Sequence, residues 1–365
     1  MPSSSQTRRE TSASPAGLDI ASLRILRLAL GTALSMWFSQ IVNWPMSFIA
    51  PVFTMFILAL PFPAPSFKGG IKFVVVLVVC AYAGLALLPF VLNQRWVGVL
   101  LLTLALFHSF YFTARGGSAV LGTFATVGLA IATSVGTVTI DGALQVVSGL
   151  TVGAVFGIAF VWIAHAILPD SSARAKPAQD AQDVAAPPKA PAPDLRDARR
   201  HAFRSLLIVM PIILWFLLSS ASASYAALLI KVASMGQQAS LDQTKDAGKS
   251  LLLSTLIGGA AAVIGWEVLS IWPSLIMYVL LIGLAALIMG PRIFAGQGMH
   301  PAAATWSYAF LTMIVILAPA VLDGQAGSSA DAAFWSRFQM FIIATLYGVG
   351  AVFIFDALWP TRRDD

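Results

Sequence analysis

Residues 71–89 read IKFVVVLVVCAYAGLALLP, an almost uninterrupted apolar run with a single charged side chain near its start. A helix of about 20 such residues is long enough to cross about 30 Å of hydrocarbon. Similar runs recur along the chain, which is 58% apolar and only 10% charged. Soluble domains carry about 25% charged residues, so this composition excludes a water-soluble fold. The sequence therefore predicts an integral membrane protein.

The predicted fold class is an all-α polytopic membrane protein with about 12 transmembrane helices. The predicted spans are 22–42, 45–60, 71–89, 96–114, 119–138, 145–168, 202–219, 223–238, 250–266, 270–289, 302–321 and 335–358. A transmembrane β-barrel is excluded because its strands would alternate apolar and polar residues, whereas these segments are continuously apolar.

A stretch rich in Ala, Pro and charge, residues 171–200, separates the sixth span from the seventh and is predicted to be a flexible linker. The first residues are polar and lack the apolar core of a signal peptide, so we expect them to stay attached. The expected segments are a disordered cytoplasmic tail at 1–21, a first six-helix half at 22–169, the flexible cytoplasmic linker at 170–201, a second six-helix half at 202–360 and a cytoplasmic tail at 361–365.

The two halves resemble each other. Arg27 stands near the start of the first half as Arg204 does in the second, and the basic, Gly-containing stretch at 65–77 resembles the one at 244–255. An even number of spans in each half gives parallel repeats, related by an axis along the membrane normal. We therefore predict two parallel six-helix repeats.

The distribution of charge orients the protein. Most of the 22 Lys and Arg residues lie in the tails, the linker and the loops of one predicted side; Arg95 and Arg337 fall on the other side, and Lys231 lies inside a span. Cytoplasmic loops carry such an excess of basic residues. We expect a multi-pass protein of the bacterial inner membrane with cytoplasmic N- and C-termini, and the net charge of +6 then needs no nucleic-acid partner.

Motifs for enzymatic chemistry are missing from the sequence. Gly248-Lys249-Ser250 resembles the end of a phosphate-binding loop, but Gln243 stands where that motif needs its first Gly. The four histidines lie in separate segments without metal-ligand spacing. We predict no enzymatic activity, no metal and no cofactor. A membrane-embedded enzyme stays open as an alternative, because catalytic residues can come from distant spans.

The predicted second and eighth spans are short and interrupted, which makes them candidates for a binding site. Pro45 and Pro51 lie at the start of the second, and the eighth is unusually polar. Paired short or broken helices at matching places mark the central site of many transporters, because they free backbone groups to hold a substrate. The alternative is that both segments only pack as short helices.

Lys231 is the charged residue of the eighth span. It shares one helical face with Ser224 and Gln238, which lie seven residues before and after it. A lysine in hydrocarbon costs at least about 2.5 to 3.5 kcal/mol unless it reaches water or a polar cavity. We expect a cavity-facing cation that attracts an anionic ligand, and a lysine whose ammonium reaches the membrane surface is the alternative.

Two further polar features are candidates for a role in substrate binding or proton coupling. His108, Tyr111 and Arg115 form a stripe on the fourth span, for binding or, at His108, for proton coupling. The alternative for His108 is a packed, hydrogen-bonded residue without a functional role. Asp356 near the end of the last span is a proton carrier or one partner of a structural ion pair.

The eleventh span carries a polar face with Thr305, Tyr308 and Thr312, for binding or for helix–helix hydrogen bonds. In the sixth span, Gly149, Gly153 and Gly157 repeat the GxxxG spacing that allows close helix contact, within the fold or between protomers of a homo-oligomer.

The chain resembles the fusaric acid resistance and aromatic acid exporter superfamily of bacterial inner-membrane proteins, in particular a short branch without the large cytoplasmic domain. The resemblance rests on residues 26–33 (LRLALGTA), on Asn43-Trp44-Pro45 followed by residues 50–53 (APVF), and on the basic loops at 67–72 and 245–250.

This resemblance implies export of aromatic carboxylic acids or related amphipathic compounds, together with a periplasmic membrane-fusion adaptor. Lys231, Arg115 and His108 would then meet a carboxylate, and Trp44 and Tyr225 would stack on a ring. No ATP-binding segment is recognisable, so an ion-driven mechanism is expected. A non-transporting scaffold subunit of a membrane complex is the other alternative.

Overall fold

The computed structural model describes residues 19–169, 195–218, 226–241, 247–296, 298–325 and 330–358. The α-helices are α1 (Ile20–Val42), α2 (Ile49–Leu58), α3 (Phe67–Ala86), α4 (Leu88–Asn93), α5 (Arg95–Ala114), α6 (Ala119–Gly136), α7 (Ile140–Ile167), α8 (Leu195–Leu218), α9 (Ala226–Leu241), α10 (Ala247–Ile271), α11 (Leu275–Met289), α12 (Ala303–Gln325) and α13 (Ala330–Leu358). Between α11 and α12 lie a 3₁₀ turn, η4 (Gly290–Arg292), and two antiparallel strands, β1 (Phe294–Ala295) and β2 (Gly298–Met299).

Ten helices of the described residues are long and apolar enough to cross a membrane, counting α3 and α4 as one and α11 together with the turn η4 as one. The chain is thus an all-α protein with the helices of a multi-pass membrane protein. Each of the ten coincides with one predicted span. The other two predicted spans correspond to α2, with 10 residues, and to α9, of which the structure describes 16 residues, and neither is among the ten. The count of twelve spans therefore stays a prediction.

The outer helices present apolar side chains to their surroundings. Val75 and Val79 of α3 are exposed, as are Ile276, Leu280 and Leu284 of α11. Soluble proteins rarely expose apolar surface on this scale, whereas lipid tails are a suitable solvent for it. These faces are therefore the lipid-facing sides of the bundle.

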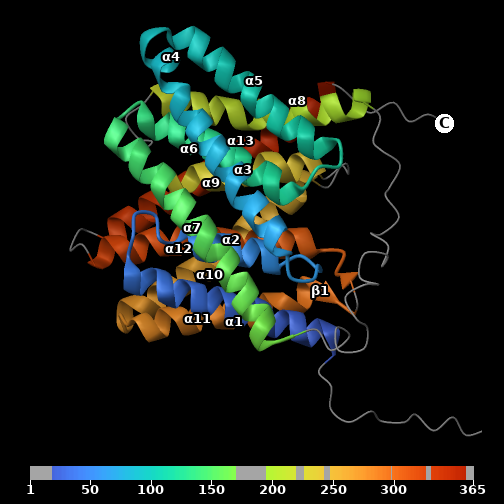
Figure 1. Cartoon of the computed structure of the whole chain (residues 1–365), viewed down its shortest axis with the longest axis vertical. Coiled ribbons are helices and arrows are strands. Elements are labelled where there is room, and N and C mark those ends of the chain that lie inside the picture. Colours follow the sequence, from blue (N-terminus) through green and yellow to red (C-terminus); the bar gives the residue numbers. More distant parts are fainter. Residues whose placement is uncertain are drawn as a thin grey trace, which may run out of the picture.

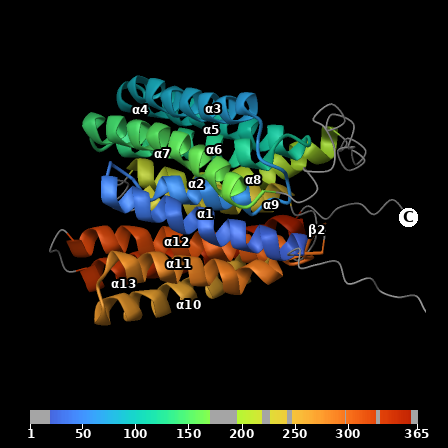
Figure 2. The ribbon, with the colours of Figure 1, turned by 60° about the horizontal axis from the view of Figure 1, so that its bottom comes forward.

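The helices run roughly along one direction and form three tiers. Figure 2 shows α1, α2, α8 and α9 between an upper tier of α3 to α7 and a lower tier of α10 to α13. The first helix of each half packs against the opposite half: α1 contacts α11, and α8 contacts α5 (Figure 1). The two halves of the chain are therefore interlocked. α6 and α12 are the most deeply buried of the long helices.

Local sequence explains why α2 is short. α1 ends at Val42, and the C-cap residue Asn43 has a φ of 48°, the left-handed conformation that often follows the end of a helix. Met46 also has a positive φ, of 57°, so the chain turns before α2 can begin. Pro51 lies within the first turn of α2, where its missing N–H costs no helical hydrogen bond. The helix ends at Leu58, shortly before the prolines at 61, 63 and 65.

The glycine stripe of α7 lies against α2. A Cβ atom at Gly153 would lie 3.0 Å from Ile49 Cγ2, and one at Gly157 would lie 2.6 Å from Phe53 Cβ. Gly149 packs in the same way against the backbone of Pro45. The GxxxG spacing thus serves close helix contact within the fold.

Several boundaries differ from the predicted ones. α8 begins at Leu195 rather than at 202, because the polar residues 195–201 continue the helix beyond its apolar part. The break after α3 at Leu87, followed by Pro89 in the first turn of α4, falls within an apolar run, so hydropathy does not reveal it. The rest of the predicted linker and both predicted tails lie mainly outside the described residues.

Arg27 joins the first and last helices of the N-terminal half, residues 19–169. Although Arg27 is only 3% exposed, its guanidinium donates through Nε (3.1 Å) and Nη2 (2.5 Å) to the carbonyl oxygen of Leu168, which follows α7. Carbonyls at a helix C-terminus lack partners within the helix, and a cation is favourable there. Arg27 therefore caps α7 from α1.

We expect Arg27→Gln to destabilise the protein, because at least one of these two charged hydrogen bonds is lost. Such a bond contributes about 1.5 to 3 kcal/mol. The measurement is the thermal unfolding midpoint of the purified protein in detergent. Arg95→Gln, at an exposed position at the start of α5, is the matched control and should leave the midpoint unchanged. Equal midpoints for the two variants would contradict the capping role.

Candidate functional site

Helix α9 lies at the centre of the molecule. It contacts α5, α6, α8, α10, α12 and α13, and every residue from 228 to 236 is buried. Figure 1 shows it surrounded by other helices. A helix of 16 residues enclosed on all sides in this way has no lipid-facing surface along its described middle part. Its polar residues therefore meet other helices, not lipid.

Lys231 is the charged residue in this buried stretch. Its side chain is 0% exposed, and Nζ donates a hydrogen bond of 2.7 Å to Oγ1 of Thr312 on α12. Thr312 in turn donates to the carbonyl oxygen of Tyr308, also at 2.7 Å. Ser234 of α9 donates to the carbonyl oxygen of Lys231 at 2.6 Å. These contacts form a polar cluster between α9 and α12.

The cluster contains no negative charge among the described residues, where no carboxylate oxygen lies within 4 Å of Lys231 Nζ. An ammonium group has three N–H donors, and the described contacts satisfy one of them. Buried charges are normally paired, because desolvation costs several kcal/mol for each ion. A charged ammonium group in this position would be stabilised by a negative charge beside it.

Helix α12 connects this cluster to both α2 and α10. The ring of Tyr308, which is 6% exposed, lies edge-on to Phe56 of α2 with 5.8 Å between the ring centroids. One turn earlier, Thr305 shares a hydrogen bond of 2.7 Å with Ser250 of α10. Of the predicted site residues, the structure thus brings Lys231 and Tyr308 together. Thr305 lies further along the same helix.

Thr54 is the buried polar residue of α2. Its hydroxyl lies 3.1 Å from Ser35 Oγ on α1, 2.9 Å from the Ala50 carbonyl oxygen and 3.2 Å from the carbonyl oxygen of Gly157 on α7. These neutral groups satisfy one another, so Thr54 has the contacts of a packing residue. It holds α2 to the two helices beside it.

Thr54 and Lys231 follow an arginine and precede a lysine at equal intervals in the sequence. Arg27, Thr54 and Lys72 follow one another at the same intervals as Arg204, Lys231 and Lys249. A small neutral hydroxyl thus fills this place in the first half, and a cation fills it in the second.

The predicted stripe on α5 lies elsewhere. His108 is exposed, with Nδ1 2.8 Å from the carbonyl oxygen of Leu104 one turn earlier on the same helix. The Arg115 guanidinium lies 5.5 Å from the centroid of the Tyr111 ring. All three side chains are thus at or near the surface. The fully buried Lys231 is not part of this stripe.

Two predicted residues belong to the connection between α1 and α2 and to α2 itself. The ring of Trp44 packs against Phe38 and Phe156, with centroid distances of 6.2 and 5.3 Å. Pro51 is buried in the first turn of α2. Neither contacts Lys231 in a described interaction. Ser224 and Tyr225, together with the side chains of Gln238 and Asp356, lie outside the described residues.

The site also contains residues that the sequence did not single out as ligands. Ser234 lies three positions after Lys231, and this spacing places both on one helical face. Thr312 belongs to the predicted polar face of the eleventh span, but its pairing with Lys231 has no sequence signal. The sequence does contain a signal for Thr54. The number of residues from Arg27 to Thr54 equals the number from Arg204 to Lys231, so a comparison of the two segments would have paired Thr54 with Lys231.

Comparison with known proteins gives one match. Residues 24–164 match a family model. Its description is "Protein of unknown function (DUF2955)", and the match runs from α1 into the last turn of α7. No curated protein and no solved structure matches the chain. The resemblance to the fusaric acid resistance superfamily therefore stays a prediction.

Proposed function

We propose that the chain is an ion-driven efflux permease of the bacterial inner membrane for aromatic carboxylic acids or related amphipathic compounds. The observation that carries this proposal is Lys231, a fully buried cation without a described carboxylate partner on the short central helix α9. A side chain that costs this much free energy in a bundle core persists where function requires it. A carboxylate that reaches Lys231 supplies the missing negative charge.

We further propose that the twelve predicted spans form two parallel six-helix repeats. Matching helix pairs support this. The contact between α3 and α6 in the first half corresponds to the contact between α10 and α12 in the second. The contact between α1 and α2 corresponds in the same way to that between α8 and α9. The contacts between halves match as well, α1 with α11 and α8 with α5. The family match, which ends close to the predicted end of the first half, agrees with this division.

Paired short helices support a central transport site. α2 and α9 hold matching places in the proposed repeats and correspond to the two shortest predicted spans, 45–60 and 223–238. Both contact the deeply buried α12. In the proposed mechanism α9 moves away from α12, the hydrogen bond between Lys231 and Thr312 breaks, and the substrate carboxylate takes the place of Thr312. The aromatic ring then lies near Tyr308 and Phe56. A coupled ion gradient drives the cycle, and a periplasmic adaptor receives the substrate.

Growth of a deletion strain tests the proposal. Cells without the protein should be sensitive to aromatic acids such as benzoate, and the wild-type gene should restore growth. Lys231→Met, at verified equal expression, should not restore it, because the cation is gone. Lys72→Met, at an exposed position, is the matched control and should behave as wild type. Rescue by Lys231→Met would contradict a role of this cation in export.

Transport into vesicles tests the energy source. Uptake of labelled benzoate by inverted membrane vesicles should fall to the level of vesicles without the protein when the proton gradient is collapsed. Uptake that continues undiminished would exclude coupling to protons.

One observation favours a non-transporting scaffold as the second candidate. Lys231 and Thr312 contact each other directly, so the polar faces of α9 and α12 are packed together in this structure. A scaffold requires that this contact persists. A cysteine pair that cross-links α9 to α12 would leave a scaffold functional, whereas it would stop a permease until the disulfide is reduced.

A further inference from the structure

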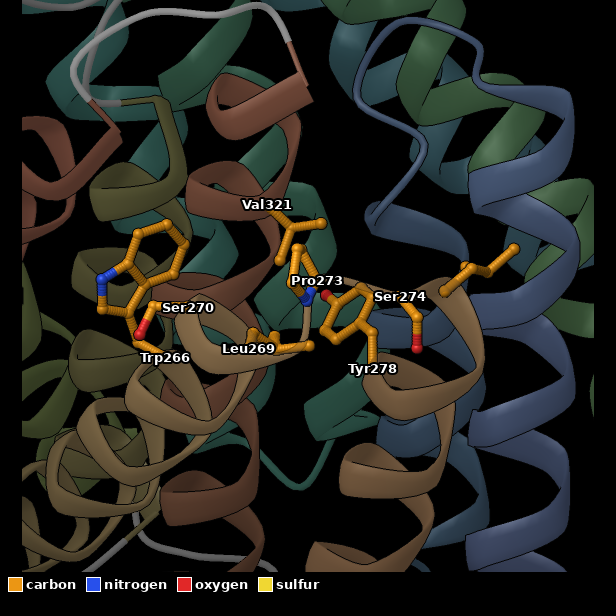
Figure 3. A pocket seen from close by; sticks show the side chains of 8 residues that line it. Trp266, Leu269, Ser270, Pro273, Ser274, Tyr278 and Val321 are labelled. Carbon is orange, nitrogen blue, oxygen red and sulfur yellow. The ribbon is translucent and has the colours of Figure 1, made fainter.

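A cavity of about 280 Å³ lies between α10, α11 and α12, at the end of α10 and the beginning of α11. The predicted topology places this end of the helices on the periplasmic side. Figure 3 shows the side chains around it. The described lining residues are Trp266, Leu269, Ser270, Pro273, Ser274, Leu275, Tyr278 and Val321. Ligand pockets have volumes from about 300 to 1,000 Å³, so this cavity is just below that range and suits only a molecule of about the size of a single aromatic ring.

Tyr278 supplies a hydrogen-bonding group without a partner. The residue is 1% exposed, and its hydroxyl has no hydrogen-bond partner among the described residues. Figure 3 shows the ring pointing in among the other lining side chains, with the hydroxyl oxygen toward Pro273. Buried hydroxyls are normally hydrogen-bonded, because a buried group without a partner loses the bonds that it makes to water. The hydroxyl oxygen is itself buried, so a molecule that enters the cavity reaches this donor when the neighbouring lining side chains shift.

The rest of the wall is apolar and uncharged. Trp266, which is 8% exposed, stacks on Phe334 of α13 with 5.1 Å between the ring centroids, and this stack fixes the orientation of the indole. The hydroxyls of Ser270 and Ser274 already bond the backbone, to the carbonyl oxygen of Glu267 and the N–H of Met277. No charged side chain belongs to the described lining. The cavity thus offers aromatic contact, one phenol and the two serine hydroxyls, each of which has one bond to the backbone, but no counter-charge for an ion.

We propose that this cavity is a binding site for a neutral aromatic molecule that carries a hydrogen-bond acceptor, with Tyr278 as the donor. The ring of the ligand packs against Trp266, Leu269 and Val321, and its acceptor takes the phenolic hydrogen bond. This cavity is separate from the site at Lys231, which lies between α9 and α12 and contains a basic side chain. It does not depend on the proposed transport function.

Two probe compounds of the same shape test the site. Acetophenone has a carbonyl acceptor, and ethylbenzene lacks one. Equilibrium dialysis of the purified full chain in detergent should show binding of both compounds. Tyr278→Phe should lower the affinity for acetophenone about tenfold, which is the effect of losing one hydrogen bond. The affinity for ethylbenzene should not change, because Tyr278→Phe removes only the hydroxyl. Tyr82→Phe, at a residue 54% exposed on α3, is the matched control and should leave both affinities unchanged.

A second variant separates the cavity from other apolar surfaces. Val321→Trp fills the cavity and should abolish saturable binding of both probes, while the thermal unfolding midpoint shows that the variant is folded. Binding of both probes to Lys231→Met should equal that to wild type, so failure of the transport proposal would leave this one intact. Unchanged acetophenone affinity in Tyr278→Phe, or saturable binding to folded Val321→Trp, would overturn the proposal.

Discussion

Lys231→Met is expected to make the protein more stable and at the same time inactive in transport. Methionine has a similar length and no charge, so the variant removes the desolvation cost of a buried ammonium and keeps its packing. Replacing a buried ion pair by apolar residues of similar volume is often neutral or stabilising by about 1 to 4 kcal/mol, and we expect a gain in stability for this single charge as well. Thr312 keeps its bond to the Tyr308 carbonyl, so no new buried hydroxyl is left without a partner.

The measurement is the thermal unfolding midpoint of wild type and variant in the same detergent, beside benzoate transport in proteoliposomes. Lys72→Met, which removes an exposed charge, is the control and should change neither quantity. A permease that keeps a costly cation for function predicts a higher midpoint and lost transport. A lower midpoint for Lys231→Met would show that the lysine contributes to the fold instead, and would favour the scaffold.

Gly157→Leu is expected to destabilise the fold strongly. A Cβ atom at this position would lie 2.6 Å from Phe53 Cβ and 3.2 Å from the carbonyl oxygen of Ala50, both on α2. The side chain fits only if α7 moves away from α2, and this also breaks the hydrogen bond from Thr54 to the Gly157 carbonyl. Overpacking costs about 1 to 3 kcal/mol and occasionally more, and contact with a backbone places this variant at the upper end.

Gly350→Leu is the matched control. Gly350 also lies inside a long helix, α13, but a Cβ atom there would meet nothing within 4 Å. Both substitutions gain about the same helix propensity over glycine, so the difference between them isolates the packing at α2. Gel-filtration profiles and unfolding midpoints should show loss of folded protein for Gly157→Leu alone. Similar profiles for the two variants would mean that the contact between α7 and α2 is not tight.

The helices themselves could be predicted from the sequence to a large extent. Each of the ten long helices coincides with a predicted span, because apolar runs of sufficient length form helices in lipid whatever their neighbours are. The extra break at Leu87 could not be predicted, because it lies between apolar residues. The early start of α8 at Leu195 was also missed, since its first turns are polar.

The candidate site was predictable only in part. Hydropathy marks Lys231 as a charge inside an apolar segment, and the structure places it in the core. Its partner could not be predicted, because Thr312 is one of several hydroxyl residues on apolar helices. For His108 the sequence predicts a polar stripe but not which way the stripe faces, and the structure places that residue at the surface.

The sequence by itself determined that this chain is a helical membrane protein, where most of its helices lie and which residues are polar within them. This follows because lipid offers no hydrogen bonds, so each apolar segment must satisfy its own backbone as a helix. Only the tertiary structure decided that α1 packs on α11, that the glycines of α7 receive α2 and that Lys231 meets Thr312. Helix pairing in lipid depends on close fit between surfaces of equal polarity, and that fit exists only once the helices come together.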